Sequence, residues 1–130
     1  MKKIKSLLFA LIISGAFISC ASTPAIPEDA TATQLIQMGQ DALELSNYKA
    51  AETYYLAVIQ KYGTDMALYV EARYELGHLY LVQKKYDEAY TSFAEIQNIY
   101  AESEFGKIPG TYRKLSQLGM ERLPEKYQKK

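Results

Sequence analysis

The chain has 130 residues, with 15 basic and 15 acidic side chains, one cysteine and one histidine. This length suits a single domain. One cysteine excludes an internal disulfide and a zinc site of several thiolates, because both require at least two. Residues 1–19 contain three lysines and no acidic residue, so acidic side chains outnumber basic ones in the rest of the chain. This mildly acidic balance argues against a nucleic-acid partner, which would require a basic face.

The chain begins with a pattern typical of a secretory signal peptide. A basic segment, KKIK, is followed by an apolar run over residues 7–18 and then by small residues. The run is too short to span a bilayer, which requires about 20 helical residues. We therefore predict that residues 1–19 are a signal peptide that is cleaved.

The cysteine stands directly after this segment. The sequence FISC, ending at Cys20, resembles a bacterial lipoprotein box, in which diacylglycerol is attached to the cysteine thiol before cleavage. Phe17 stands where leucine is usual, a departure associated with lipoproteins of spirochaetes and Bacteroidetes. The resemblance implies that Cys20 is a lipid attachment site whose acyl chains hold the protein on a membrane. The alternative is an ordinary secreted protein with a lone thiol at its mature end.

Residues 20–32 are predicted to be the lipidated cysteine and a flexible tether. They are rich in alanine, threonine and proline, and Pro24 and Pro27 disfavour both helix and strand. In lipoproteins of enterobacterial type, an aspartate directly after the cysteine favours the inner membrane. Ala21 stands there instead, so the resemblance implies an outer-membrane protein whose domain faces the periplasm.

From Thr33 onward, apolar residues recur at spacings of three and four, as amphipathic helices require. Asn47 is expected to cap a second helix, which ends at Gly63. Asp65 is expected to cap a third helix, and a fourth begins near Tyr86.

A break at residues 107–110 precedes a fifth helical segment, which ends before Pro124. No segment alternates with period two for long enough to indicate a sheet. The sequence therefore predicts an all-α domain over residues 33–123, followed by a polar tail over residues 124–130.

The predicted helices repeat as pairs at a constant spacing. Gly39 aligns with Gly77, and the segments NYKAAETYY and KYDEAYTSF align with each other. This pattern resembles the tetratricopeptide repeat, in which small residues let two helices approach and large rings fill the space beside them. The resemblance implies two helix hairpins and a C-terminal capping helix over residues 109–123, which together form a fragment of an α-solenoid. The alternative is a generic helical bundle with coincidental small residues.

The repeat is longer than the standard tetratricopeptide unit of about 34 residues. The extra residues fall in KYGTDMALYVEARYELG and are expected to lengthen the start of the third helix by about one turn. In this respect residues 33–103 resemble BamD-type outer-membrane assembly lipoproteins and YbgF-like periplasmic coordinators. BamD-type proteins usually carry five repeats, whereas this chain has two and a cap. The resemblance implies a protein-binding module of a β-barrel assembly complex, whose partner is an outer-membrane barrel assembly protein.

Tetratricopeptide arrays bind partners mainly through the first helix of each pair. Tyr74 and His78 form an i, i+4 pair on this face that would contact a peptide, and the face is more apolar than solvent exposure requires. The alternative is that its side chains complete a small core. Tetratricopeptide domains that bind the tails of chaperones use lysine and asparagine on this face. Other residues stand at the corresponding positions here, so we do not expect this chain to bind a chaperone tail. Carried over by this resemblance, the predicted partner-binding residues are Ile36, Gln40, Leu43, Tyr74, His78, Leu81 and Met120.

No pattern in the chain indicates an enzyme. His78 is a lone histidine, Cys20 is taken by the lipid, and no glycine-rich phosphate loop is present. We therefore expect no catalytic residue, metal, cofactor or small-molecule substrate. Two other functions remain open: a lipid-anchored scaffold or coordinator of envelope and peptidoglycan machinery, and a surface-exposed lipoprotein. Two repeats are marginal for an independent solenoid, so we expect the partner to stabilise the domain.

Overall fold

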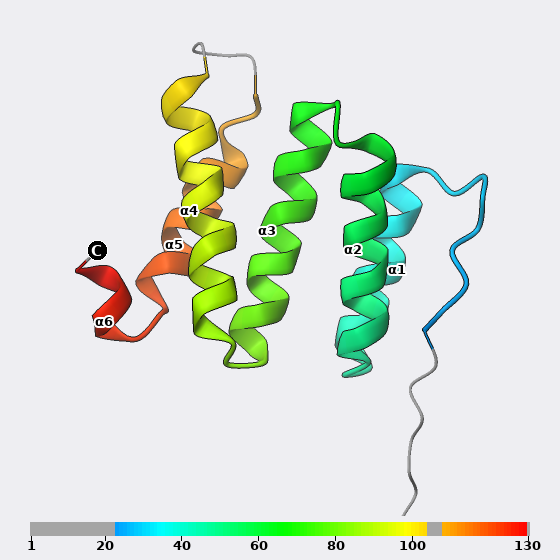
Figure 1. Ribbon diagram of the computed structural model, residues 1–130, viewed down its shortest axis with the longest axis horizontal. Helices are drawn as coiled ribbons and strands as arrows, with labels where there is room; N and C mark the ends of the chain where they lie inside the picture. Colours follow the sequence, from blue (N-terminus) through cyan, green and yellow to red (C-terminus); the bar gives the residue numbers. More distant parts are fainter. Residues whose placement is uncertain (1–22, 104–107, 130) are drawn as a thin grey trace, which may run out of the picture.

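The computed structural model of the protein describes residues 23–103 and 108–129, and in these residues all regular structure is helical. Successive helices run in a row from α1 and α2 at one end to α5 and α6 at the other (Figure 1). The prediction of an all-α domain with two helix hairpins and a C-terminal capping helix is confirmed. Cys20 and residues 1–19 lie outside the described residues. The helices are α1 (Ala32–Glu44), α2 (Tyr48–Tyr62), α3 (Met66–Val82), α4 (Tyr86–Glu102), α5 (Thr111–Glu121) and α6 (Glu125–Gln128).

The helix starts follow from side-chain caps. Thr31 accepts a hydrogen bond from the Gln34 backbone N–H, and the Gln34 side chain accepts one from the Thr31 backbone N–H at 2.8 Å, which together form a capping box. Helix α1 therefore begins at Ala32, one residue before the predicted start. Asn47 and Asp65 cap α2 and α3, as predicted.

The two hairpins are copies of each other down to their turns. Ser46 and Lys84, which occupy the same position in the two copies, both adopt the left-handed conformation, with φ of 58° and 60°. Helix α1 begins seven residues before Gly39, whereas α3 begins eleven residues before Gly77. The predicted extra turn at the start of the third helix is therefore confirmed.

Close approach of the helices depends on glycines that face aromatic rings. A Cβ atom on Gly39 would clash with the ring of Tyr55, and one on Gly77 would lie 2.6 Å from Cε1 of Phe93. Helix α5 repeats the arrangement, because a Cβ on Gly119 would also lie 2.6 Å from the Phe93 ring. Both rings are almost completely buried. The predicted role of small residues in the hairpins is therefore confirmed.

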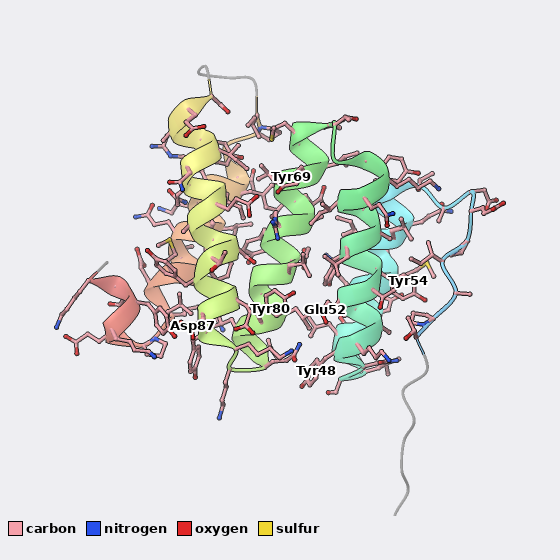
Figure 2. The ribbon with its side chains drawn as sticks, viewed as in Figure 1. Tyr48, Glu52, Tyr54, Tyr69, Tyr80 and Asp87 are labelled. Carbon is pink, nitrogen blue, oxygen red and sulfur yellow. The ribbon has the colours of Figure 1, made fainter. Side chains whose placement is uncertain are left out.

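Polar contacts join α3 to α2 of the first hairpin and to α4 of its own hairpin. Tyr80 of α3 and Glu52 of α2 point toward one another (Figure 2), and the Tyr80 hydroxyl donates to Glu52 Oε1 at 2.6 Å. Between α3 and α4, Arg73 forms an ion pair with Glu95 at 2.8 Å, and the Tyr69 hydroxyl donates to the same carboxylate. These contacts fix α3 against both of its neighbours.

The predicted tether ends earlier than expected. Ala30 is buried, and its carbonyl accepts hydrogen bonds from Tyr62 Oη at 2.6 Å and Lys61 Nζ at 3.1 Å. The prediction that the tether extends to residue 32 is therefore wrong, because the end of α2 holds the chain at Ala30.

The C-terminal segment is not simply the polar tail that we predicted. Pro124 starts the short helix α6, whose Tyr127 is 4% exposed. Tyr127 packs in one cluster with Ala89 and Phe93, and its hydroxyl donates to Asp87 Oδ1 at 2.7 Å. This ring covers the end of the second hairpin, so the domain extends past residue 123.

Candidate protein-binding groove

An open groove crosses the first helices of the hairpins and the capping helix. It consists of two adjoining hollows that share Tyr74 and His78. The first hollow, of about 550 Å³, lies between α1 and α3, and the second, of about 400 Å³, lies between α3 and α5. Residues lining the first hollow include Gln40, Leu43, Glu44, Tyr48, Glu75 and Val82, and those lining the second include Leu81, Phe93, Leu115, Leu118 and Arg122.

Five of the seven predicted partner-binding residues line this groove. Gln40, Leu43, Tyr74 and His78 lie in the first hollow, and Leu81 joins Tyr74 and His78 in the second. The structure therefore brings residues from both hairpins together on one surface.

Two predicted residues do not line the groove. Ile36 is 5% exposed and belongs to a core cluster with Val58 of α2 and Ala72 of α3. Its prediction as a partner contact is wrong, because α2 and α3 already cover it. Met120 is partly buried, packs against the cluster around Phe93 and lines neither hollow.

Tyr74 is the centre of an aromatic cluster. Its ring stacks on His78 with centroids 6.3 Å apart and an interplanar angle of 13°, so the predicted i, i+4 pair is confirmed. The same ring lies 6.1 Å from Phe93 of α4 and 5.6 Å from Tyr112 of α5. Contacts on three helices restrict the rotamers of Tyr74, which leaves little side-chain entropy to lose when a partner binds.

A carboxylate that the sequence analysis missed lies at the first hollow. Glu75 is 8% exposed, and it accepts a hydrogen bond from Gln40 Nε2 at 3.0 Å. Burial raises the pKa of Glu75, while the Gln40 hydrogen bond and the nearby His78 oppose this shift. A signal existed in the sequence: Ala72, Glu75 and Leu79 recur at spacings of three and four, which places an acidic residue on the buried stripe of α3.

Tyr55 of α2 is the buried polar neighbour of Glu75. Its side chain is fully buried, and its hydroxyl interacts with the Glu75 carboxylate by charge and by hydrogen bonding. Burial, and then the Glu75 charge, raise the pKa of Tyr55, so the hydroxyl remains protonated. The Glu75 carboxylate therefore lies between two neutral hydrogen-bonding groups, the Gln40 amide of α1 and the Tyr55 hydroxyl of α2.

Other kinds of site find no support in residues 23–103 and 108–129. No group of three or more histidine, cysteine, aspartate and glutamate side chains in these residues is arranged to hold a metal ion. No helix within the same residues has the length and apolar character needed to cross a membrane.

The fold defines the class of the molecule as a fragment of an α-solenoid built from helix hairpins. No protein-family model matches the chain, and no solved structure matches it. An uncharacterized protein of Treponema pallidum (strain Nichols) is 28% identical to it over 123 residues. The similarity covers 92% of this chain but 49% of the relative, so the chain spans about half the length of that protein.

Proposed function

We propose that the protein binds a protein partner in the groove formed by α1, α3 and α5. The observation that carries this proposal is the junction of the two hollows at Tyr74 and His78, which makes one open surface from residues of both hairpins. An exposed trough with aromatic and aliphatic walls and a few polar groups suits an extended or helical protein segment. Catalysis is not part of the proposal.

We further propose that Cys20 carries lipid and that the protein is anchored to the outer membrane, facing the periplasm. The lipoprotein-like FISC segment and the preceding apolar run support this assignment. Ala30, where the domain begins to hold the chain, lies ten residue steps after Cys20. A fully extended segment of that length spans at most about 36 Å, so the groove would stay near the membrane surface.

We propose an outer-membrane barrel assembly protein as the partner. The support is the similarity of the repeats to those of BamD-type assembly lipoproteins, including the lengthened start of α3. This similarity concerns the repeat unit, and the groove described above is the surface on which such a partner would be tested.

The test is crosslinking in intact cells from a photoreactive amino acid placed in the full-length chain. Position Leu43 lies in the groove, whereas position Leu56 on α2 is exposed and lines neither hollow, which makes it the matched control. We expect a specific adduct with a barrel assembly protein from position 43 and not from position 56, and loss of that adduct in C20S.

Two other results would redirect or contradict the proposal. An adduct with peptidoglycan-active enzymes alone would replace the assembly role with that of an envelope scaffold. Equal adducts from positions 43 and 56, or none from either, would contradict binding in the groove.

A further inference from the structure

The first hollow has the charge pattern of a site for a cation. Its ionisable lining residues include Glu44, Glu75 and His78, and no lysine or arginine of residues 23–103 and 108–129 lines it. Most protein surfaces intersperse both signs of charge, so an apolar hollow with two carboxylates and no fixed cation is selective for a positively charged guest. Acidic or phosphorylated segments would meet repulsion here.

The buried carboxylate of Glu75 has no cation of its own. Within the described residues it interacts with the Gln40 amide, the Tyr55 hydroxyl and the nearby His78, and it takes part in no ion pair. Buried carboxylates are normally paired, because desolvation of an isolated charge is costly. Glu75 is therefore an anionic group that the fold leaves available at the edge of the groove.

The hydrogen-bond partners of Glu75 among the described residues are neutral. Gln40 donates from α1, and the fully buried Tyr55 hydroxyl of α2 interacts with the carboxylate by charge and by hydrogen bonding. An ionised carboxylate has about four acceptor sites, so two neutral donors leave part of its capacity unused. An ammonium or guanidinium group that enters the hollow offers several N–H donors to the remaining sites.

The walls of the hollow suit the stem of a basic side chain. Leu43, Tyr48, Tyr74 and Val82 line the space beside Glu75. Lysine and arginine carry a long apolar stem and a charged end, so the stem would contact these walls while the end reaches the carboxylate. A volume of about 550 Å³ accommodates one such side chain together with the backbone that carries it.

We propose that the first hollow is a recognition site for a lysine or arginine side chain of the protein partner, with Glu75 as its acceptor. This inference rests on the proposed function, because it names the chemistry of the segment that the groove binds. The first hollow, between α1 and α3, then determines which segment the groove binds. The aromatic cluster around Tyr74 contributes contacts that do not depend on the charge of the segment.

The test is a titration of the full-length ¹⁵N-labelled chain in detergent micelles with three peptides. They are acetyl-Ala-Leu-Lys-Leu-Ala-amide, the same peptide with arginine at the central position, and the same peptide with norleucine, which has no charge. We expect the two basic peptides to shift the backbone amide signals of Gln40, Leu43 and His78 in a saturable way. The norleucine peptide should bind about tenfold more weakly or worse, as expected for loss of a charge-assisted hydrogen bond.

Two variants locate the effect. Glu75→Gln should bring the affinity of the lysine peptide down to that of the norleucine peptide, whereas Glu44→Gln, at the exposed rim, should change it less than about twofold. The comparison of lysine with norleucine on the unaltered chain stays informative even if Glu75→Gln does not fold.

The outcomes separate this inference from the proposed function. Equal binding of lysine and norleucine peptides in the groove would overturn the cation site and leave peptide binding intact. Shifts that are absent from the groove with all three peptides would count against both. Selective binding of the lysine peptide that survives Glu75→Gln in a folded variant would remove Glu75 from the role.

Discussion

In the first hairpin a tyrosine packs against the glycine of the facing helix, and in the second hairpin a phenylalanine occupies the equivalent position. Tyr55 meets Gly39, and Phe93 meets Gly77. The next helix then treats the two rings differently: α3 brings the Glu75 carboxylate near Tyr55, whereas α5 brings Gly119 against Phe93. The same pairing of ring and glycine is therefore part of a polar site beside the groove in the first hairpin and of a purely apolar contact in the second.

Truncation of the shared ring should break the second hairpin most severely. Phe93→Ala removes a ring that is 1% exposed and that contacts glycines of both α3 and α5. We expect the free energy of unfolding to fall by about 3–5 kcal/mol, measured by urea denaturation of the full-length chain. Tyr55→Ala should have a similar cost, because it also removes a fully buried ring that packs against a glycine. As a control, Leu56→Ala on an exposed part of α2 should change stability by less than about 0.5 kcal/mol.

Alanine at either helix-contact glycine should destabilise both hairpins to a similar extent. A Cβ at Gly39 or Gly77 would overlap a buried ring. Alanine gains about 1 kcal/mol in helix propensity, but overpacking should outweigh this gain and give a net loss of about 1–2 kcal/mol. Gly110→Ala is the matched control, since a Cβ there meets no atom within 4 Å. A stabilised Gly77→Ala variant would contradict the packing described here.

Exchange of the two rings tests the polar difference directly. Tyr55→Phe removes a buried hydroxyl that interacts with the Glu75 carboxylate and should destabilise the domain by about 1 kcal/mol. The reverse change, Phe93→Tyr, should destabilise it by about 1–3 kcal/mol, because the added hydroxyl would be buried against Gly119. Thermal unfolding followed by circular dichroism measures both changes. A stabilised Tyr55→Phe variant would indicate that the hydroxyl makes no favourable hydrogen bond to Glu75.

The smallest expected difference lies at the helix caps. Asn47 and Lys85 have nearly the same backbone conformation, with φ and ψ of −84° and 70° and of −81° and 75°, but only Asn47 supplies a side-chain cap. Asn47→Ala should cost about 1 kcal/mol, and Lys85→Asn should gain about 0.5 kcal/mol by giving α4 the missing cap. The same unfolding measurements would show whether the two caps are interchangeable. No gain from Lys85→Asn would mean that α4 is already stabilised by Asp87 and Glu88 in its first turn.

The repeat pattern made most of the fold predictable. Caps such as Asn47 and Asp65 act within a few residues, so helix starts can be read from local sequence. The burial of Tyr127 could not be read in this way, because it depends on a change of direction at Pro124 and on the surface that α4 presents. The partner surface was predicted by position in the repeat, and Ile36 failed because α2 and α3 approach each other over that position.

Glu75 shows a different limit of sequence reading. An acidic residue on a helix is usually solvated. Glu75 is buried instead, because the stripe of α3 on which it lies is buried. The periodicity that places Glu75 among core residues was visible, but the neighbouring amide of Gln40 and hydroxyl of Tyr55 come from other helices. Their convergence required the packing of both hairpins.

The enclosure of Phe93 between two glycines also has a consequence for motion. Gly77 and Gly119 both pack against the ring, so we expect a half-turn about its axis to displace atoms of α3 or α5 for a moment. Because Phe93 also lines the second hollow, we expect such displacements to widen that end of the groove. The flip rate of this ring can be measured from the exchange of its two edges in nuclear magnetic resonance. That rate would therefore report how often the second hollow widens.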